Sequence, residues 1–191
     1  MVCEMGLDMF LEKYDKAAWK FKDLYIPIVK QENPELYKRL KPLIVNGEYG
    51  ESLSIEVAYW RKADAIHRWF VENVQDGLDD CGTYEVTKEQ LQQLLNICIS
   101  VRDGSEMEKG WIKNGETFKN GMWCPVMQEG EYISNPNIAE SLLPTEIGFF
   151  FGHTEYDERY MGHINDTIEM LVKILDETDF DKEIIAYTSI W

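Results

Sequence analysis

Residues 54–75 carry the side chains best suited to binding chemistry. Their sequence, SIEVAYWRKADAIHRWFVENVQ, contains two tryptophans, a tyrosine, a histidine and three cationic side chains. Indole rings stack on flat ligands, and guanidinium groups form paired hydrogen bonds with phosphate or carboxylate oxygens. This composition favours a flat, polar, anionic ligand or a defined protein partner, since tryptophan, tyrosine and arginine also concentrate at protein interfaces.

Apolar residues recur at helical spacing in the same stretch, which predicts one amphipathic helix. Residues 60 and 67, like residues 61 and 68, are seven positions apart and would lie on one side of that helix. A second segment, GHTEYDE, would close the pocket from the side. The candidate ligand-binding residues are Tyr59, Trp60, Arg61, Lys62, His67, Arg68, His153, Thr154 and Tyr156.

A purely structural interpretation of both segments stays open. In the first segment the aromatic rings would then belong to the core, and the cations would pair with some of the chain's many carboxylates. In the second, Thr154 would cap the last long helix, with Asp157 completing a capping box. The three phenylalanines at residues 149–151 would be buried between Gly148 and Gly152.

Metal and nucleophile chemistry has weaker support in the sequence. Imidazoles and carboxylates that could bind zinc or manganese are His67, Asp79, Asp80, His153, Glu155 and Asp157. Their spacing matches no motif such as HExxH, and the chain has no P-loop and no nucleophile elbow. The four cysteines are widely spaced without a CxxC pair, which indicates reduced thiols. We therefore expect no catalytic residues, no metal and no cofactor.

Composition indicates an acidic, globular protein. The 191 residues include 35 acidic and 19 basic side chains, a net charge of −16, and 45% are hydrophobic. Such acidity argues against general affinity for nucleic acid or anionic membranes, and no apolar run is long enough to span a membrane. We expect a single cytoplasmic domain over residues 1–191 that could also form a homo-oligomer.

The remaining patterns predict an α+β fold. Strands are expected near residues 5–14 and in the tail EIIAYTSIW, and helices near residues 16–25, at PELYKRL, and after Thr87. Thr87 opens a capping box with Gln90, followed by a stripe of leucines. Residues 103–136 are expected to be an irregular excursion, with a small hairpin at Asn114-Gly115. About three main helices should pack on a small sheet formed by the N- and C-terminal strands.

Four segments together resemble a family of small proteins encoded in tailed phages and, as prophages, in bacterial genomes. They are MGLDMFLEKY, AYWRKADAIHRWFVENVQDGLDDCG, SLLPTEIGFFFGHTEYDERY and YTSIW. The resemblance extends over nearly the full length, and it departs at the first four residues and at residues 106–135. It implies an origin and no particular activity, although a phage origin favours a host-interaction or anti-defence role.

Two main functional hypotheses follow. In the first, a non-enzymatic protein sequesters a small anionic, nucleotide-derived host immune signal in the bacterial cytoplasm. In the second, an acidic inhibitor occupies a basic groove of a host defence nuclease, with residues 103–136 as a reaching loop. A third hypothesis, a phage housekeeping enzyme, would be indicated by loss of activity on chelation.

Overall fold

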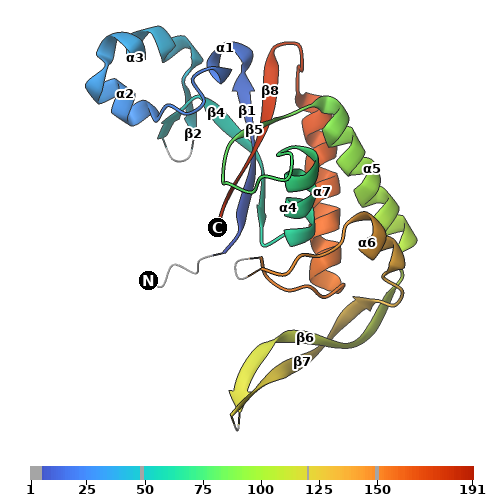
Figure 1. Ribbon diagram of the computed structural model, residues 1–191. Coiled ribbons are helices and arrows are strands. Elements are labelled where there is room, and N and C mark those ends of the chain that lie inside the picture. The colour runs from blue at the N-terminus through green and yellow to red at the C-terminus, as the bar shows by residue number, and fades with distance from the viewer. Residues whose placement is uncertain (1–5, 48–49, 120, 149–150) are drawn as a thin grey trace.

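A four-stranded antiparallel sheet lies at the centre of the fold (Figure 1). In the computed structural model, which describes residues 6–47, 50–119, 121–148 and 151–191, its strands follow the order β4-β1-β8-β5. The strands are β1 (Asp8–Asp15), β4 (Ser54–Arg61), β5 (Tyr84–Val86) and β8 (Glu183–Ile190). The first and last of them, β1 and β8, pair along their whole length. Both ends of the chain therefore contribute central strands.

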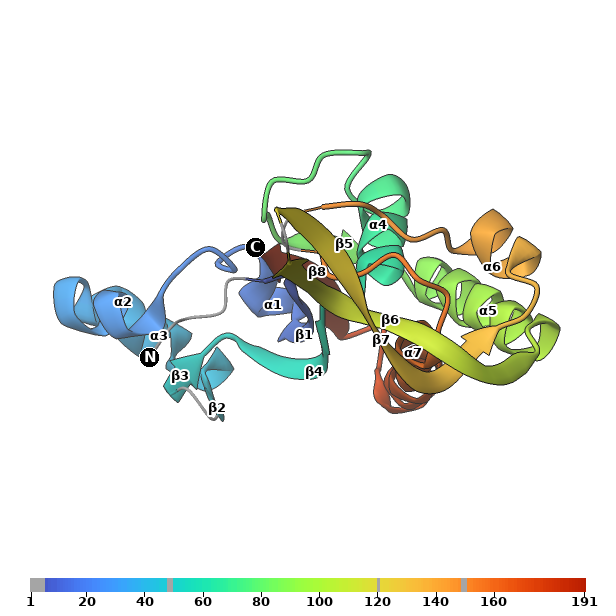
Figure 2. The same ribbon diagram turned by 90° about the horizontal axis from the view of Figure 1, so that it is seen from below.

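Helices cover the sheet on two sides, as the view from below shows (Figure 2). The α-helices are α1 (Lys16–Trp19), α2 (Ile26–Glu32), α3 (Pro34–Leu40), α4 (Asp64–Asn73), α5 (Lys88–Gly104), α6 (Asn137–Leu142) and α7 (Glu158–Glu177). A 3-10 turn, η1 (Lys41–Leu43), follows α3, and β2 (Val45–Gly47) pairs with β3 (Gly50–Ser52). The α+β class is confirmed. The predicted number of helices is wrong, because the described residues form seven α-helices and eight strands.

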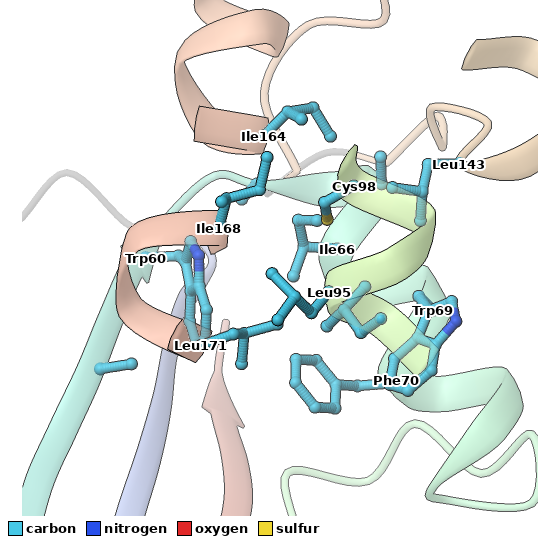
Figure 3. Packing of buried hydrophobic residues seen from close by; sticks show 14 of the residues in the cluster. Trp60, Ile66, Trp69, Phe70, Leu95, Cys98, Leu143, Ile164, Ile168 and Leu171 are labelled. Carbon is cyan, nitrogen blue, oxygen red and sulfur yellow. The ribbon is translucent and has the colours of Figure 1, made fainter. Parts of the chain in front are cut away.

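The main core lies between the sheet and helices α4, α5 and α7 (Figure 3). Alternate residues of each strand point to one face of a sheet, so Met9, Leu11, Trp60 and Tyr187 share the inner face. Helices α5 and α7 pack their apolar stripes against these side chains. The buried stripe of α5 is the predicted one, and its members are Leu91, Leu94, Leu95, Cys98 and Val101.

A second, smaller core covers part of the outer face of the sheet. Tyr14 and Ala186, which point away from α7, pack there with buried side chains of α1, α2 and α3. The rest of the outer face carries Phe10 and Tyr59, whose ring centroids are 5.3 Å apart. The two cores explain why β1 and β8 carry buried apolar side chains on both faces.

The single helix predicted for residues 54–75 is wrong. Residues 54–61 form strand β4, and the helix α4 begins only at Asp64. Lys62 separates the two elements with φ 57, a left-handed conformation that ends a strand or helix. Because strand side chains alternate with a period of two, Trp60 points inward while Tyr59 and Arg61 point outward. The helical register that grouped these residues does not exist.

Residues 103–136 are a regular structure and not the irregular excursion that the sequence indicated. Strands β6 (Met107–Lys119) and β7 (Met122–Ile133) form a long antiparallel hairpin that projects from the lower end of the helical layer (Figure 1). We call this hairpin the arm. The pair Asn114-Gly115, expected to be its turn, is a β-bulge within β6, where Gly115 has φ 84.

The two predicted capping boxes have different outcomes. The Thr87 hydroxyl accepts a hydrogen bond from the Gln90 amide at 3.2 Å, and the Gln90 side chain accepts one from the Thr87 amide, as expected. The cap of α7 is Asp157 and not Thr154, because the Asp157 carboxylate accepts hydrogen bonds from the amides of Arg159 and Tyr160. The helix therefore begins three residues later than predicted. The N-terminal appendage and the burial of Phe149 and Phe150 lie outside the described residues.

Candidate functional site

The two tryptophans expected to stack on a ligand are core residues. Trp60 is 3% exposed and Trp69 is 4% exposed. The Trp60 indole N–H donates to the Thr167 hydroxyl at 2.8 Å, which satisfies its one polar atom inside the core. Neither ring is available for stacking on a ligand in this conformation.

Tyr59 and Arg61 lie on the opposite side of the sheet from Trp60. The Tyr59 hydroxyl donates to the Asp8 carboxylate at 2.5 Å, and this hydrogen bond raises the pKa of Tyr59. The Arg61 guanidinium lies 4.0 Å from the same carboxylate. This part of the predicted site is a cross-strand cluster on the outer face, in which acidic and basic groups already balance.

Lys62 and Arg68 do not share a pocket wall with these residues. The Lys62 amide donates to the Leu7 carbonyl at 2.7 Å, and its side chain runs past Gly6 and Gly152. Arg68 extends from the exposed side of α4 and donates to Glu72, one turn later, at 2.8 Å. Hydrogen bonding to Glu72 raises the pKa of Arg68, so the pair is electrostatically satisfied at the surface.

His67 is the centre of a buried polar chain. Its ring is fully buried, with the Tyr187 hydroxyl 2.7 Å from Nδ1 and the Asp79 carboxylate 3.1 Å from Nε2. The tautomer that satisfies both contacts has Tyr187 donating to Nδ1 and Nε2–H donating to Asp79. The other Asp79 oxygen accepts from the Trp191 indole at 3.1 Å.

Carboxylate, imidazole and hydroxyl in series are also the parts of a catalytic triad. Here the hydroxyl belongs to Tyr187, which is fully buried and stacked on Phe70 with centroids 4.0 Å apart. Burial raises the pKa of Tyr187 well above its usual value, which opposes formation of a nucleophilic phenolate. These hydrogen bonds between Asp79, His67 and Tyr187 therefore hold α4, β8 and the loop at Asp79 together. The buried Tyr187 hydroxyl is not placed to attack a substrate.

A buried carboxylate fastens the segment after α6 to the start of α4. The Asp64 side chain, 4% exposed, accepts a hydrogen bond from the Glu146 amide at 2.6 Å. Burial raises its pKa from 3.8 to about 6, although backbone hydrogen bonds and the nearby His153 act in the opposite direction. Phe151, further along the same segment, contacts the His67 ring. Residues 145–148 and Phe151 are thus held along one side of α4.

The segment with His153, Thr154 and Tyr156 forms the base of the arm. The His153 ring lies 3.2 Å from the Asp157 carboxylate, which also accepts from Arg159. Asp157 is almost fully buried, and hydrogen bonds to His153 and Arg159 outweigh that burial and lower its pKa. The Thr154 carbonyl and the Tyr156 hydroxyl accept from the side chain and the amide of Thr145.

One cavity does contain two of the predicted residues. It has a volume of about 380 Å³ and is lined by Lys113, Gly115, Glu116, Ile147, Gly148, Gly152, His153, Thr154 and Glu155. Lys113 forms an ion pair with Glu116 at 2.8 Å. With the second carboxylate, Glu155, the cavity is lined by two carboxylates and one lysine.

The predicted residues thus divide among five places: the core, the outer face of the sheet, the junction between β4 and α4, the exposed side of α4, and the base of the arm. Within the described residues no group of three His, Cys, Asp or Glu side chains is placed to hold a metal ion. The helices of the same residues include none with the length and apolarity needed to cross a membrane. Sequence reasoning missed Asp64 and Tyr187, and neither lies in a motif that would have revealed its partner.

Carboxylates dominate the surface near α4. Residues 69–87 contain five acidic and no basic side chains, and residues 120–158 contain seven acidic side chains with no lysine or arginine. The structure brings parts of both runs together on either side of His67, through Asp79 and Phe151. We call the resulting surface the acidic rim; its members are Glu72, Asp76, Asp79, Asp80 and Glu146. Three of them, Glu72, Asp76 and Asp80, are exposed.

Comparison with known proteins gives no relative for this arrangement. No protein-family model, no curated protein sequence and no solved structure matches the chain.

Proposed function

We propose that the protein is a non-enzymatic binding protein whose acidic rim engages a basic surface of another protein. The observation that carries this proposal is the distribution of charge. Arg68, the one cation of the helix beside the rim, is occupied by Glu72, and the loop that follows α4 adds further carboxylates without a lysine or arginine. Opposite charges on the two partners accelerate association and set its orientation.

Carboxylates from separate segments of the chain act on the same neighbouring side chains, which supports the same proposal. The carboxylates of Glu72 and, more weakly, of Glu146 raise the pKa of Arg68, although Glu146 is far from Arg68 in sequence. On the other side of the loop, burial raises the pKa of Tyr84, and the hydrogen bond to Asp80 and the charges of Asp80 and Asp76 raise it further. A surface on which carboxylates act together attracts a cluster of lysines or arginines more strongly than scattered charges do.

In the form that the resemblance to phage proteins favours, the partner is a host defence nuclease in the bacterial cytoplasm. Such an enzyme has a basic groove for nucleic acid, and an acidic protein that occupies the groove competes with the substrate. Binding by mass action then lowers activity without turnover by the inhibitor.

The experiment compares two variants that each remove two negative charges. Asp76→Asn with Asp80→Asn neutralises part of the rim, whereas the matched control, Asp166→Asn with Glu169→Gln, neutralises exposed residues on α7. Tagged proteins are used to isolate basic proteins from the bacterial host at low and at high salt. We expect a basic partner that is retained by wild type and control, is lost from the rim variant, and is released by salt because screening weakens exposed charges.

Two results would contradict the proposal. The first is the absence of any basic protein that binds in a salt-dependent way. The second is equal weakening by both variants, because that would indicate a response to net charge and no specific role for the rim.

Sequestration of a small nucleotide-derived anion is the second candidate. The observation in its favour is the cavity that His153 and Thr154 share with Lys113. Calorimetry with a panel of nucleotides tests this candidate, and a panel without a binder would exclude it.

A further inference from the structure

Strand β4 forms the long open edge of the central sheet. Among the described residues it pairs with β1 on one side and with no strand on the other. The strand at the opposite margin, β5, has three residues, whereas β4 has eight. Figure 2 shows β4 at the margin of the sheet, between the β2–β3 hairpin and α7. An open edge presents backbone N–H and C=O groups with which another extended chain can pair.

The sequence of β4, SIEVAYWR, lacks the residues that usually block such an edge. It contains no proline and no lysine. Val57 is the extra residue of a β-bulge relative to β1, which twists the edge but does not end the strand. The Ser54 amide already donates to the Ser52 hydroxyl at 3.1 Å, so pairing along this edge would start after Ser54.

A cavity opens beside the first half of β4. Its volume is about 440 Å³, within the range of about 300–1,000 Å³ that ligand pockets have. Three consecutive strand residues, 54–56, belong to its wall. Since consecutive side chains of a strand point to opposite faces, a cavity lined by all three reaches round the edge of the strand. The cavity and the open edge therefore form one continuous surface.

The wall of this cavity is acidic. It contains Glu12, Glu51 and Glu56 and, among the described residues, no lysine, arginine or histidine. Glu51 is neutralised by Lys30, which lies outside the wall at 2.9 Å. Glu12 is directly opposite Glu56 in the pairing of β1 with β4. Like charges in that position repel each other, and a cation in the cavity would reduce the repulsion.

The charge of Glu12 is not balanced by a basic side chain of the described residues. Its two oxygens accept hydrogen bonds from the hydroxyls of Tyr14 at 2.7 Å and Ser54 at 3.0 Å. Both donors are neutral, and burial, together with the bond to Glu12, raises the pKa of Tyr14, so this hydroxyl stays protonated. A carboxylate can accept about four hydrogen bonds, so the half-buried Glu12 retains capacity for a cationic donor.

The rest of the wall suits the long side chain of an arginine. Tyr25 is 67% exposed and Ile55 is 50% exposed, and both line the cavity. A guanidinium group stacks on an aromatic ring as well as pairing with carboxylates. Neighbouring strands lie about 4.8 Å apart, so Glu12 in β1 lies about 10 Å from a strand added beyond β4. An arginine and a glutamate side chain together cover that distance.

We propose that β4 takes up an extended segment of a basic polypeptide as an additional strand, and that an arginine of this segment enters the cavity and contacts Glu12. Backbone hydrogen bonds along the edge would supply affinity, and the cavity would select the cationic side chain. The acidic rim lies beside α4 and before β5, the strand at the other margin of the sheet. The β4 site is therefore separate from the rim and does not depend on the function proposed for it.

The first experiment measures the binding of synthetic peptides to the full chain by calorimetry. The probe is a peptide of eight residues, the length of β4, with blocked ends and alternating arginine and valine. The matched peptide has citrulline in place of each arginine, which keeps the shape and removes the charge. We expect the arginine peptide to bind, and the citrulline peptide to bind at least about tenfold more weakly because the charged hydrogen bonds are lost.

Two single variants locate the arginine. Glu12→Gln removes the charge but keeps an oxygen that can accept from Tyr14 or Ser54, and it should weaken binding of the arginine peptide about tenfold. The matched control, Glu140→Gln, removes one charge from an exposed position on α6 and should bind as wild type does. Circular dichroism verifies that both variants are folded.

The second experiment tests the pairing with the edge and needs no variant. Two versions of the arginine peptide carry N-methyl groups on alternate backbone amides, one on the odd and one on the even positions. Alternate amides of an added strand face β4, so one version should lose binding and the other should keep it. Amide exchange in β4 should also slow when the unmethylated peptide binds.

Four results would overturn the inference. They are an arginine peptide that does not bind, a citrulline peptide that binds equally well, equal effects of Glu12→Gln and Glu140→Gln, and equal behaviour of the two N-methylated peptides. Loss of binding in the rim variant, Asp76→Asn with Asp80→Asn, would also overturn it, because the peptide would then occupy the rim. The protein partner of the rim is detected separately, from the bacterial host, so failure of one proposal is distinguishable from failure of the other.

Discussion

Replacement of Asp64 by asparagine isolates the energetic consequence of one buried carboxylate. The folded protein keeps this group 4% exposed and raises its pKa to about 6, against 3.8 for the free side chain. Asparagine has nearly the same shape, and its carbonyl oxygen can still accept the hydrogen bond from the Glu146 amide. The substitution therefore removes the titration while it preserves the contact.

The sign of the pH effect follows from proton binding. Between about pH 4 and pH 6 the folded wild type keeps the Asp64 proton, whereas the unfolded chain has lost it. Raising the pH through this window therefore destabilises the wild type but not the Asp64→Asn variant. At about 1.4 kcal/mol per pKa unit, the free energy of unfolding of the variant minus that of wild type should rise by about 3 kcal/mol.

Urea unfolding of both proteins at several pH values measures this difference directly, because titrations common to the two proteins cancel. His153 is the exception, since its charge acts on Asp64. The pair is therefore also compared in a His153→Gln background. A difference that stays flat with pH, or that falls as pH rises, would refute the argument that burial dominates the environment of Asp64.

Four further substitutions, one of them a control, test the core and a helix cap by urea unfolding. Tyr187→Phe should cost about 1–3 kcal/mol, because it leaves Nδ1 of the buried His67 ring without a donor; a loss within experimental error would mean that the ring does not depend on this contact. Leu94→Ala should cost about 2–5 kcal/mol, since Leu94 is fully buried. Val172→Ala, at an exposed position on α7, should stay within about 0.5 kcal/mol of wild type, and similar losses for both would argue against the assigned core. Thr87→Ala should cost about 1 kcal/mol by removing the cap of α5, and amide exchange should speed up at the first turn of that helix; unchanged exchange there would contradict the cap.

Local chemistry explains the elements that the sequence identified correctly. The Thr87–Gln90 box satisfies the free amides of α5 by short-range hydrogen bonds, so its pattern is visible in four consecutive residues. The helix PELYKRL begins at Pro34, whose fixed φ and missing N–H suit a first helical position. The tail strand β8 is rich in β-branched and aromatic residues and has no competing helical pattern.

The boundary between β4 and α4 within residues 54–75 could not be predicted from neighbouring residues alone. No glycine or proline separates β4 from α4, and the apolar positions of a strand and of the following helix can be fitted to one helical period. The break is set by Lys62, whose left-handed conformation is stabilised by a hydrogen bond to Leu7 and by the packing of its side chain along Gly6 and Gly152. Those partners are distant in sequence.

The amino-acid sequence by itself determined the acidity, the α+β class, the stripe of α5 and the strand character of the tail. Only the tertiary structure decided that Trp60 and His67 are interior groups, that two acidic runs meet beside α4, and that tryptophans of the arm face solvent. The physical reason is the same in each case. Burial and charge environment depend on which distant segments pack together, whereas caps and periodicity are properties of neighbouring residues.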